Sequence, residues 1–319
     1  MTAAPQAGDK IDALARHCAD RWYVTEFATA IRERRLPLKR YRNFIITLYP
    51  VVVGFNGGLI RSVAKLDELQ KSVRAGELVE EILTIDHVRN SDRIQILAVE
   101  LRTLAREERL PRLRALARQL NEEQVHNDYW RKMLEAHGID HVASYSTFET
   151  YLHETPPREL DRMTQEVLTA LMEGHSPDAF HNTSFSQPVL ALCHYLTRTS
   201  ADPAVKFYIY HGLQSAIEFT LVKTVSESIF PGVAGTRDHP QLHPELVPDA
   251  RITDVGAVPL SIKWWDEHSD YGQGGRTELN HIKHGREQLN RELREEADIK
   301  EALCRVDEVL RLFFAAAVA

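Results

Sequence analysis

A carboxylate and an imidazole one helical turn apart are the most chemically suggestive residues of this chain. Glu123 and His126 lie within an apolar stripe at helical spacing that continues from Leu120 to Trp130, so both side chains are expected to point inward. Residues three apart on a helix can bind one metal ion or share one proton. A buried charge is costly without a partner, and a bound cation would compensate both groups. Taken alone, the pair can also be interpreted as a solvated glutamate and a structural histidine.

Two later segments supply further polar groups on apolar helical faces. Glu218 is flanked by apolar residues at positions 217, 219 and 221, and His268 follows two tryptophans. The hypothesis is that Glu123, His126, Glu218 and His268 converge at one point, although about 145 positions separate the first from the last. It fails if the imidazoles of His126 and His268 lie on opposite sides of the molecule.

The elements that must position these residues are helical by periodicity almost throughout. The expected helices cover residues 8–33, 38–69, a pair within 68–108, 111–137, 156–174, 188–198, 202–230, 259–271 and 276–316. Pro50 should kink the second helix, and Ser91 or Asp92 should cap the second helix of the pair. Pro111 suits a first turn, and Gly138 suits the position after a last turn.

The remaining segments are expected to be connectors. Residues 139–155 contain a short helical turn, 174–188 form a loop, and 231–259 form a long loop rich in Pro, Gly, His and Asp. We therefore predict an all-α protein with one helical domain over residues 1–319. In it, 68–108 is an inserted helical pair.

Composition limits the classes of function. The net charge of −7 argues against a nucleic-acid partner, and local basic clusters such as Arg32 to Arg35 are interpreted as solvated helix faces. The three cysteines are far apart and lack metal-ligand spacing, which favours reduced thiols in a cytoplasmic setting. No apolar leader and no run of about eighteen apolar residues is found, so neither a membrane partner nor a membrane anchor is expected.

Other histidines have weaker claims to a chemical role. His87 follows Asp86, but neighbouring side chains diverge by about 100° on a helix, so His87 is interpreted as a surface or packing residue. His239 and His243 are four apart, but each precedes a proline, which disfavours the helix that would align them.

Four segments carry a resemblance to a known family: Phe44 to Pro50, Asn121 to Trp130, Ala216 to Glu218 and Trp264 to Tyr271. Together they resemble the haem-oxygenase-like superfamily, and within it the haem-oxygenase-like diiron oxidases, relatives of TenA and PqqC. The resemblance covers roughly residues 8–290 and implies a helical bundle with the 68–108 pair as an addition. A haem oxygenase would ligate iron with a histidine of its first helix, but His17 is interpreted as structural.

The resemblance also implies a set of metal ligands. Such oxidases bind iron with a Glu and a His on one core helix, a bridging Glu on another, and a His-x3-Asp-x2-His set on a third. By position, Glu123, His126, Glu218 and His268 match this pattern. The two remaining positions of the third set do not match.

Glycines stand where the last two ligands are expected. Gly272 and Gly275 lie four and seven residues after His268, and neither has a ligating side chain. Three interpretations stay open. Either Asp270 substitutes as a ligand, or His281 or His284 enters from the last helix, or the site holds a single iron.

The leading hypothesis is a non-haem iron oxidase or oxygenase that uses Fe(II), as one or two ions, and dioxygen. Its substrate would be an amino-acid-like or fatty-acid-like small molecule in specialised biosynthesis. Glu218 would act as a labile or bridging catalytic carboxylate. Tyr49, Phe55, Trp130 and Trp264 are candidate pocket walls.

Two alternatives remain. The first is a metal-independent enzyme similar to TenA or PqqC, with Glu218 or Glu123 as general acid or base. The second is a degenerate member that binds a ligand without catalysis, which the two glycines would explain. A homodimer is one possible assembly for each of these.

Overall fold

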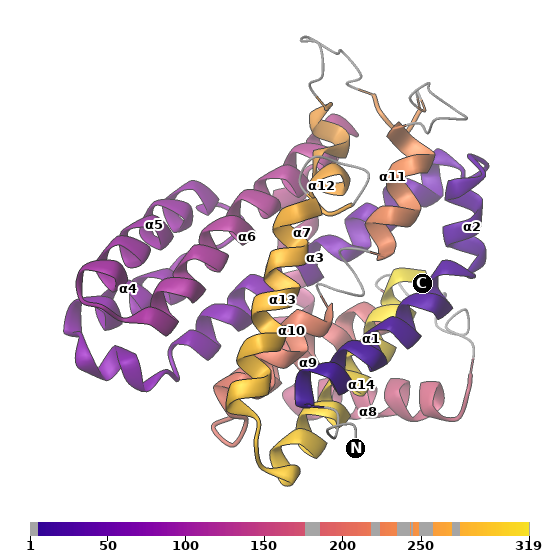
Figure 1. The fold of residues 1–319 in the computed structure, drawn as a ribbon. Helices are drawn as coiled ribbons and strands as arrows, with labels where there is room; N and C mark the ends of the chain where they lie inside the picture. The colour runs from indigo at the N-terminus through magenta and orange to yellow at the C-terminus, as the bar shows by residue number, and fades with distance from the viewer. Residues whose placement is uncertain are drawn as a thin grey trace.

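The computed structural model describes residues 6–175, 186–217, 224–234, 243, 245–248, 258–269 and 275–318, with the side chains at 234, 275–282, 284 and 318 outside that set. Within these ranges the regular structure is entirely helical, which confirms the predicted all-α class (Figure 1). The helices are α1 (Ala7–Tyr23), α2 (Glu26–Arg32), α3 (Leu38–Val63), the 3₁₀ helix η1 (Asp67–Lys71), α4 (Val73–Thr84), α5 (Ser91–Glu107), α6 (Pro111–Ala136), α7 (His141–Glu154), α8 (Pro157–Met172), α9 (Gln187–Ala201), α10 (Phe207–Ile217), α11 (Ser226–Ala234), α12 (Leu260–Glu267), α13 (Gly275–Glu292) and α14 (Glu296–Val318).

The buried apolar side chains form two clusters. The main core unites α1, α2 and α7 to α14 with one half each of α3 and α6. The lateral core is formed by α4, α5 and the other halves of α3 and α6, which project to one side of the molecule (Figure 1). On α6, Leu120 belongs to the lateral core and Trp130 to the main core. The stretch between them, which contains Glu123 and His126, therefore lies at the seam of the two clusters.

Helix α3 is the apolar axis of the bundle. It contains Pro50 in its interior and packs against α6, α9 and α10. Among the described helices, only Leu38–Val63 is long and apolar enough to cross a membrane by length and composition, and 61% of its most apolar window is buried inside the protein. That burial is typical of a core helix, because its apolar surface is already covered by neighbouring helices.

Local capping signals explain several helix boundaries. Thr25 Oγ1 accepts from the backbone N–H of Ala28 at 3.2 Å, so the expected helix 8–33 divides into α1 and α2. Pro111 opens α6, and Gly138 after its end has a φ of +67°, as the sequence predicted. Gly174, with a φ of +86°, ends α8 in the same way.

Three sequence expectations about helices were wrong. The stretch 139–155 forms the full helix α7, because Asp140 caps it by accepting from Ala143 N–H at 2.9 Å and Phe148 is buried in the main core. The helix expected over 276–316 is two helices, interrupted between Glu292 and Glu296. Asn90, rather than Ser91 or Asp92, occupies the N-cap position of α5.

The helix expected over 202–230 also differs. Residues 203–205 form a turn, and α10 begins at Phe207, with its N-terminal Lys206 bound to Asp298 of α14 at 2.7 Å. Residues 218–223, including Glu218, lie outside the described residues.

Candidate active site

Helix α6 brings Glu123 and His126 to the seam between the two cores. The side chain of His126 is 9% exposed and that of Glu123 is 17% exposed, and Glu123 Oε2 lies 3.6 Å from His126 Nδ1. Trp130 Nε1 donates to the carbonyl of Ile45 at 3.0 Å, and Asn56 Nδ2 donates to the carbonyl of Glu123 at 3.3 Å. These two bonds hold α6 against α3, so the direction of both site side chains is set by helix packing.

His268 lies directly after α12, where the helix ends. Its Nδ1 is 2.6 Å from the carbonyl oxygen of Trp264, one of the last-turn carbonyls that a helix leaves without a partner. Its ring also stacks on the Trp264 ring, with centroids 4.0 Å apart. A hydrogen bond and a stacking contact together leave the imidazole little rotational freedom.

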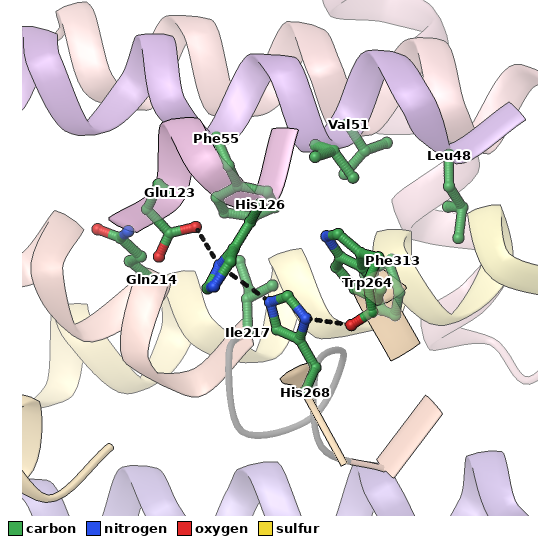
Figure 2. A pocket seen from close by; sticks show the side chains of 11 residues that line it. Leu48, Val51, Phe55, Glu123, His126, Gln214, Ile217, Trp264, His268 and Phe313 are labelled. Carbon is green, nitrogen blue, oxygen red and sulfur yellow. Dashed lines mark hydrogen bonds and ion pairs between the residues drawn. The ribbon is translucent and has the colours of Figure 1, made fainter. Parts of the chain in front are cut away.

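The two imidazoles contact each other directly. His268 Nε2 lies 3.0 Å from His126 Nδ1 (Figure 2). A carbonyl oxygen only accepts, so the proton of a neutral His268 is on Nδ1, and its lone pair is on Nε2. His126 therefore donates from Nδ1 to His268 Nε2, and Glu123 beside that nitrogen favours the same tautomer. The result is a chain of polar groups from Glu123 through both histidines to the Trp264 carbonyl.

Tryptophans hold α12 in place behind this chain. The Trp130 ring meets Trp264 edge-on, with centroids 4.6 Å apart, and Trp265 Nε1 donates to the Tyr41 hydroxyl at 2.9 Å. Burial raises the pKa of Tyr41, so the phenol stays protonated and remains a neutral anchor. The packing of these aromatic rings fixes the end of α12, and thereby His268, relative to α6.

The polar chain borders a small, mostly apolar cavity of about 50 Å³ (Figure 2). The cavity is lined by one stripe of α3 and by residues of α6, α10, α12 and α14, namely Leu48, Val51, Val52, Phe55, Glu123, His126, Gln214, Ile217, Trp264, His268 and Phe313. Ligand pockets usually enclose about 300–1,000 Å³. This space suits a few waters or a diatomic gas, rather than a complete organic substrate.

Gln214 is the polar residue of this cavity that sequence reasoning did not single out. It is 3% exposed, and its Oε1 has no hydrogen-bond partner within the described ranges. A buried amide oxygen without a partner is costly, which favours a donor in the cavity beside it. Its position on α10, four residues before Glu218, was the only available signal.

Several predicted residues are brought together, and others are not. Glu123, His126 and His268 meet, and Phe55 and Trp264 form walls of the cavity as expected. The expectation for Tyr49 and Trp130 as pocket walls was wrong. Tyr49 packs on His141 and Tyr145, and Trp130 is buried between the two tryptophans of α12.

The other residues expected to complete the site cannot be placed. Glu218, Asp270 and Gly272 lie outside the described residues, as do the side chains of His281 and His284. Within the described part of the chain, no three His, Cys, Asp or Glu side chains form a group placed to hold a metal ion.

The side chains of Glu123, His126 and His268 nevertheless fit a divalent metal by their chemistry. Imidazole nitrogens and carboxylate oxygens are donors that divalent transition metals accept, and nitrogens of His126 and His268 lie 3.0 Å apart. Donation of the second ring N–H to a carbonyl, as His268 does to Trp264, is typical of histidine ligands. The adjacent carboxylate of Glu123 would supply the negative charge that the ion requires.

Comparisons with known proteins identify no family. No family model and no curated protein matches the chain. Among solved structures, the chain is similar to a TenA homolog from Pseudomonas syringae pv. tomato, with 14% sequence identity and a TM-score of 0.49, over 100% of this chain and 98% of that chain. At that identity the roles of side chains do not carry over from one protein to the other.

Proposed function

We propose that the seam between the two cores holds iron and that the protein is a non-haem oxidase or oxygenase acting on a small molecule. The observation that supports this most directly is the meeting of His126 and His268, with imidazole nitrogens 3.0 Å apart and the Glu123 carboxylate 3.6 Å away, at the edge of an apolar cavity. Two imidazoles and one carboxylate are the donor set of non-haem Fe(II) oxygenases.

Each of the three residues has a distinct task in this proposal. His268 donates from Nδ1 to the Trp264 carbonyl. This bond directs Nε2 toward His126 and leaves the lone pair of Nε2 available for an ion. His126 would give up the hydrogen bond from Nδ1 to His268. With its proton on Nε2 instead, it would present Nδ1 to the ion. Glu123 would provide an anionic oxygen, because it already lies beside the same nitrogen.

Bound iron would supply dioxygen activation, with coordination positions left open for dioxygen and substrate. The chain itself supplies a small, mostly apolar space. Val51, Val52 and Phe55 of α3 line it beside the histidines, and the cavity of about 50 Å³ admits a small gas molecule. Gln214 can donate from its amide nitrogen or accept at its oxygen, and would orient a small polar molecule in the cavity.

The number of ions remains part of the proposal. Glu218 and Asp270 are the sequence candidates for further ligands. In the sequence, Glu218 follows Ile217, which lines the cavity, and Asp270 is two residues after His268. With both carboxylates, the set could hold two ions. With neither, the three described residues could hold one.

Anaerobic loading with Fe(II) tests the proposal. We expect wild-type protein to retain iron after desalting and the loaded protein to consume oxygen, as measured by elemental analysis and an oxygen electrode. H126A and H268A should retain little iron, whereas H153A, at a histidine with 80% side-chain exposure, should behave as wild type. Full iron retention by both H126A and H268A would overturn the metal assignment.

A second candidate is metal-independent acid–base catalysis. The direct hydrogen bond between His126 and His268 supports it, because that bond occupies the nitrogens that an ion would use and links Glu123 to the cavity through two imidazoles. Chelator-treated protein that keeps full turnover of a substrate, with loss of turnover in E123Q, would favour this candidate over the oxidase.

A further inference from the structure

A second cavity differs from the histidine cavity in the residues that line it. It occupies the junction of α5, α6 and α13, has a volume of about 580 Å³, and is open to solvent (Figure 1 shows the three helices). Five arginines line it: Arg102 and Arg106 of α5, Arg114 and Arg118 of α6, and Arg291 of α13. We name this the arginine groove. Thr103 and Gln288 add neutral hydrogen-bonding groups to the same walls.

Four of the five arginines form two like-charged pairs. Arg102 and Arg106 are four apart on α5, and Arg114 and Arg118 are four apart on α6, so each pair shares a helix face and repels. Elsewhere the chain does the opposite and places an acid four residues from a base on a helix face. Ion pairs of that kind join Lys132 to Asp128, Arg162 to Glu166, Lys263 to Glu267 and Arg311 to Asp307.

Acidic partners are scarce within the groove. Over the described part of the chain, Arg118 is the one member of the five with an ion pair, which it makes with Glu122 at 4.0 Å. The protein as a whole has a net charge of −7, so this concentration of positive charge runs against its average. A surface selected only for solubility would intersperse both signs of charge.

The groove also contains the positive end of a helix. Pro111 is the first residue of α6, and the first turn of that helix has no acidic residue of its own. Leu113 N–H is satisfied by Glu68 at 3.1 Å, while Arg114 adds positive charge where the helix dipole is already positive. The Glu68 carboxylate already supplies negative charge at this helix start, so the positive charge of the groove comes mainly from the arginine side chains.

We propose that the arginine groove binds a phosphate-bearing small molecule with at least two phosphate groups. Guanidinium groups donate in a planar fork that matches phosphate oxygens. Residues four apart on a helix are about 6 Å apart along its axis, which is longer than one carboxylate group, so a ligand with two anionic groups fits each pair better. The volume of about 580 Å³ falls in the range of small-molecule sites. Walls from three helices make this a concave site for a compact polyanion.

Titration calorimetry with wild-type protein tests the proposal and separates two sources of the phosphates. The probes are inorganic pyrophosphate, adenosine diphosphate and adenosine, each at constant ionic strength. We expect both phosphate compounds to bind and adenosine not to bind. Because the two phosphate compounds carry the same number of phosphate groups, tighter binding of the nucleotide would identify a nucleotide as the ligand, and equal or weaker binding would identify the phosphate groups alone as the feature recognised.

Charge-matched variants assign the binding to the groove. R106Q/R114Q removes two positive charges from exposed positions of the groove and should weaken pyrophosphate binding at least tenfold. R74Q/R158Q removes two positive charges from the exposed first turns of α4 and α8 and should bind as wild type does. R291Q should give an intermediate loss. H126A should bind pyrophosphate normally, which keeps this proposal separate from the iron site.

Three results would overturn the proposal. The first is absence of binding by both phosphate compounds at millimolar concentration. The second is an equal loss of affinity in R106Q/R114Q and R74Q/R158Q, which would indicate general electrostatic attraction. The third is binding of duplex DNA or an acidic polypeptide by a protein that ignores pyrophosphate, which would identify the groove as a macromolecular contact.

Discussion

The two polar regions of this protein handle charge in opposite ways, although one helix contributes to both. The middle of α6 places Glu123 and His126 beside a mostly apolar cavity of about 50 Å³, with Glu123 Oε2 3.6 Å from His126 Nδ1 and His126 Nδ1 3.0 Å from His268 Nε2. The start of α6 places Arg114 and Arg118 in an open groove of about 580 Å³, where like charges face each other. Buried polar groups require partners inside the protein. Charges exposed to solvent are stabilised by water and need no partner until a ligand binds.

The clearest test that the two regions are independent is removal of the imidazoles of His126 and His268. In H126A/H268A we expect complete loss of iron binding with no change in the affinity for pyrophosphate, because the two sites share a helix but no side chain. Elemental analysis and calorimetry on the same preparation measure both. Simultaneous loss of both activities would instead indicate that the bundle had been disrupted.

Replacement of Trp130 should cost more stability than any surface change. W130A removes a fully buried indole and its hydrogen bond to the Ile45 carbonyl, and we expect the free energy of unfolding to fall by about 3–5 kcal/mol. V73A, at a residue with 80% exposure, should change it by less than about 0.5 kcal/mol. Urea denaturation of both variants gives the comparison, and equal effects would contradict the assigned role of Trp130 in holding α6.

A buried histidine outside the site should make stability depend on pH. Burial lowers the pKa of His211 to about 4, whereas an unfolded histidine has a pKa of about 6.5. Between these values the unfolded state binds more protons, so stability is fully present above pH 6.5 and falls as the pH drops toward 4, by up to about 3 kcal/mol. Denaturation midpoints of wild type and H211Q across this range measure the effect. A parallel decline in the two proteins would show that other groups are responsible.

The smallest expected effect concerns the arginine groove without ligand. R106Q/R114Q breaks both like-charged pairs, so the free protein should be unchanged or more stable by about 0.2–0.5 kcal/mol at low salt. The gain should vanish at high salt, where charges on the surface are screened. Thermal melts at two salt concentrations check this, with R74Q/R158Q as the reference. A clear destabilisation at low salt would mean that these arginines make stabilising contacts with the protein itself.

Local sequence signals predicted a large part of the fold. The 3.6-residue repeat, Pro111 and Gly138 located α6, and the Glu123 to His126 spacing placed two polar groups on its inner face. The same repeat did not locate α7, because its buried contacts are few and its start depends on the Asp140 cap. Helix breaks were also missed at Thr25 and between α13 and α14, where apolar spacing continues across the interruption.

The two sites differ in how far sequence reasoning could reach. The histidine site could be proposed because buried polar residues are rare on apolar stripes, so each one is informative. The arginines of the groove resembled ordinary solvated helix faces, because each helix taken alone shows basic residues at normal helical spacing. Only the packing of α5 against α6 and α13 turns separate faces into one concave surface.

The amino-acid sequence by itself determined the helices, the inward direction of Glu123 and His126, and the apolar character of their surroundings, because these follow from contacts within a few residues of chain. Tertiary structure decided which distant groups meet. The end of α12 brings His268 to within 3.0 Å of His126, although 142 residues separate them in the chain. That distance depends on how aromatic side chains from α3, α6 and α12 pack, and no repeat along the chain encodes it.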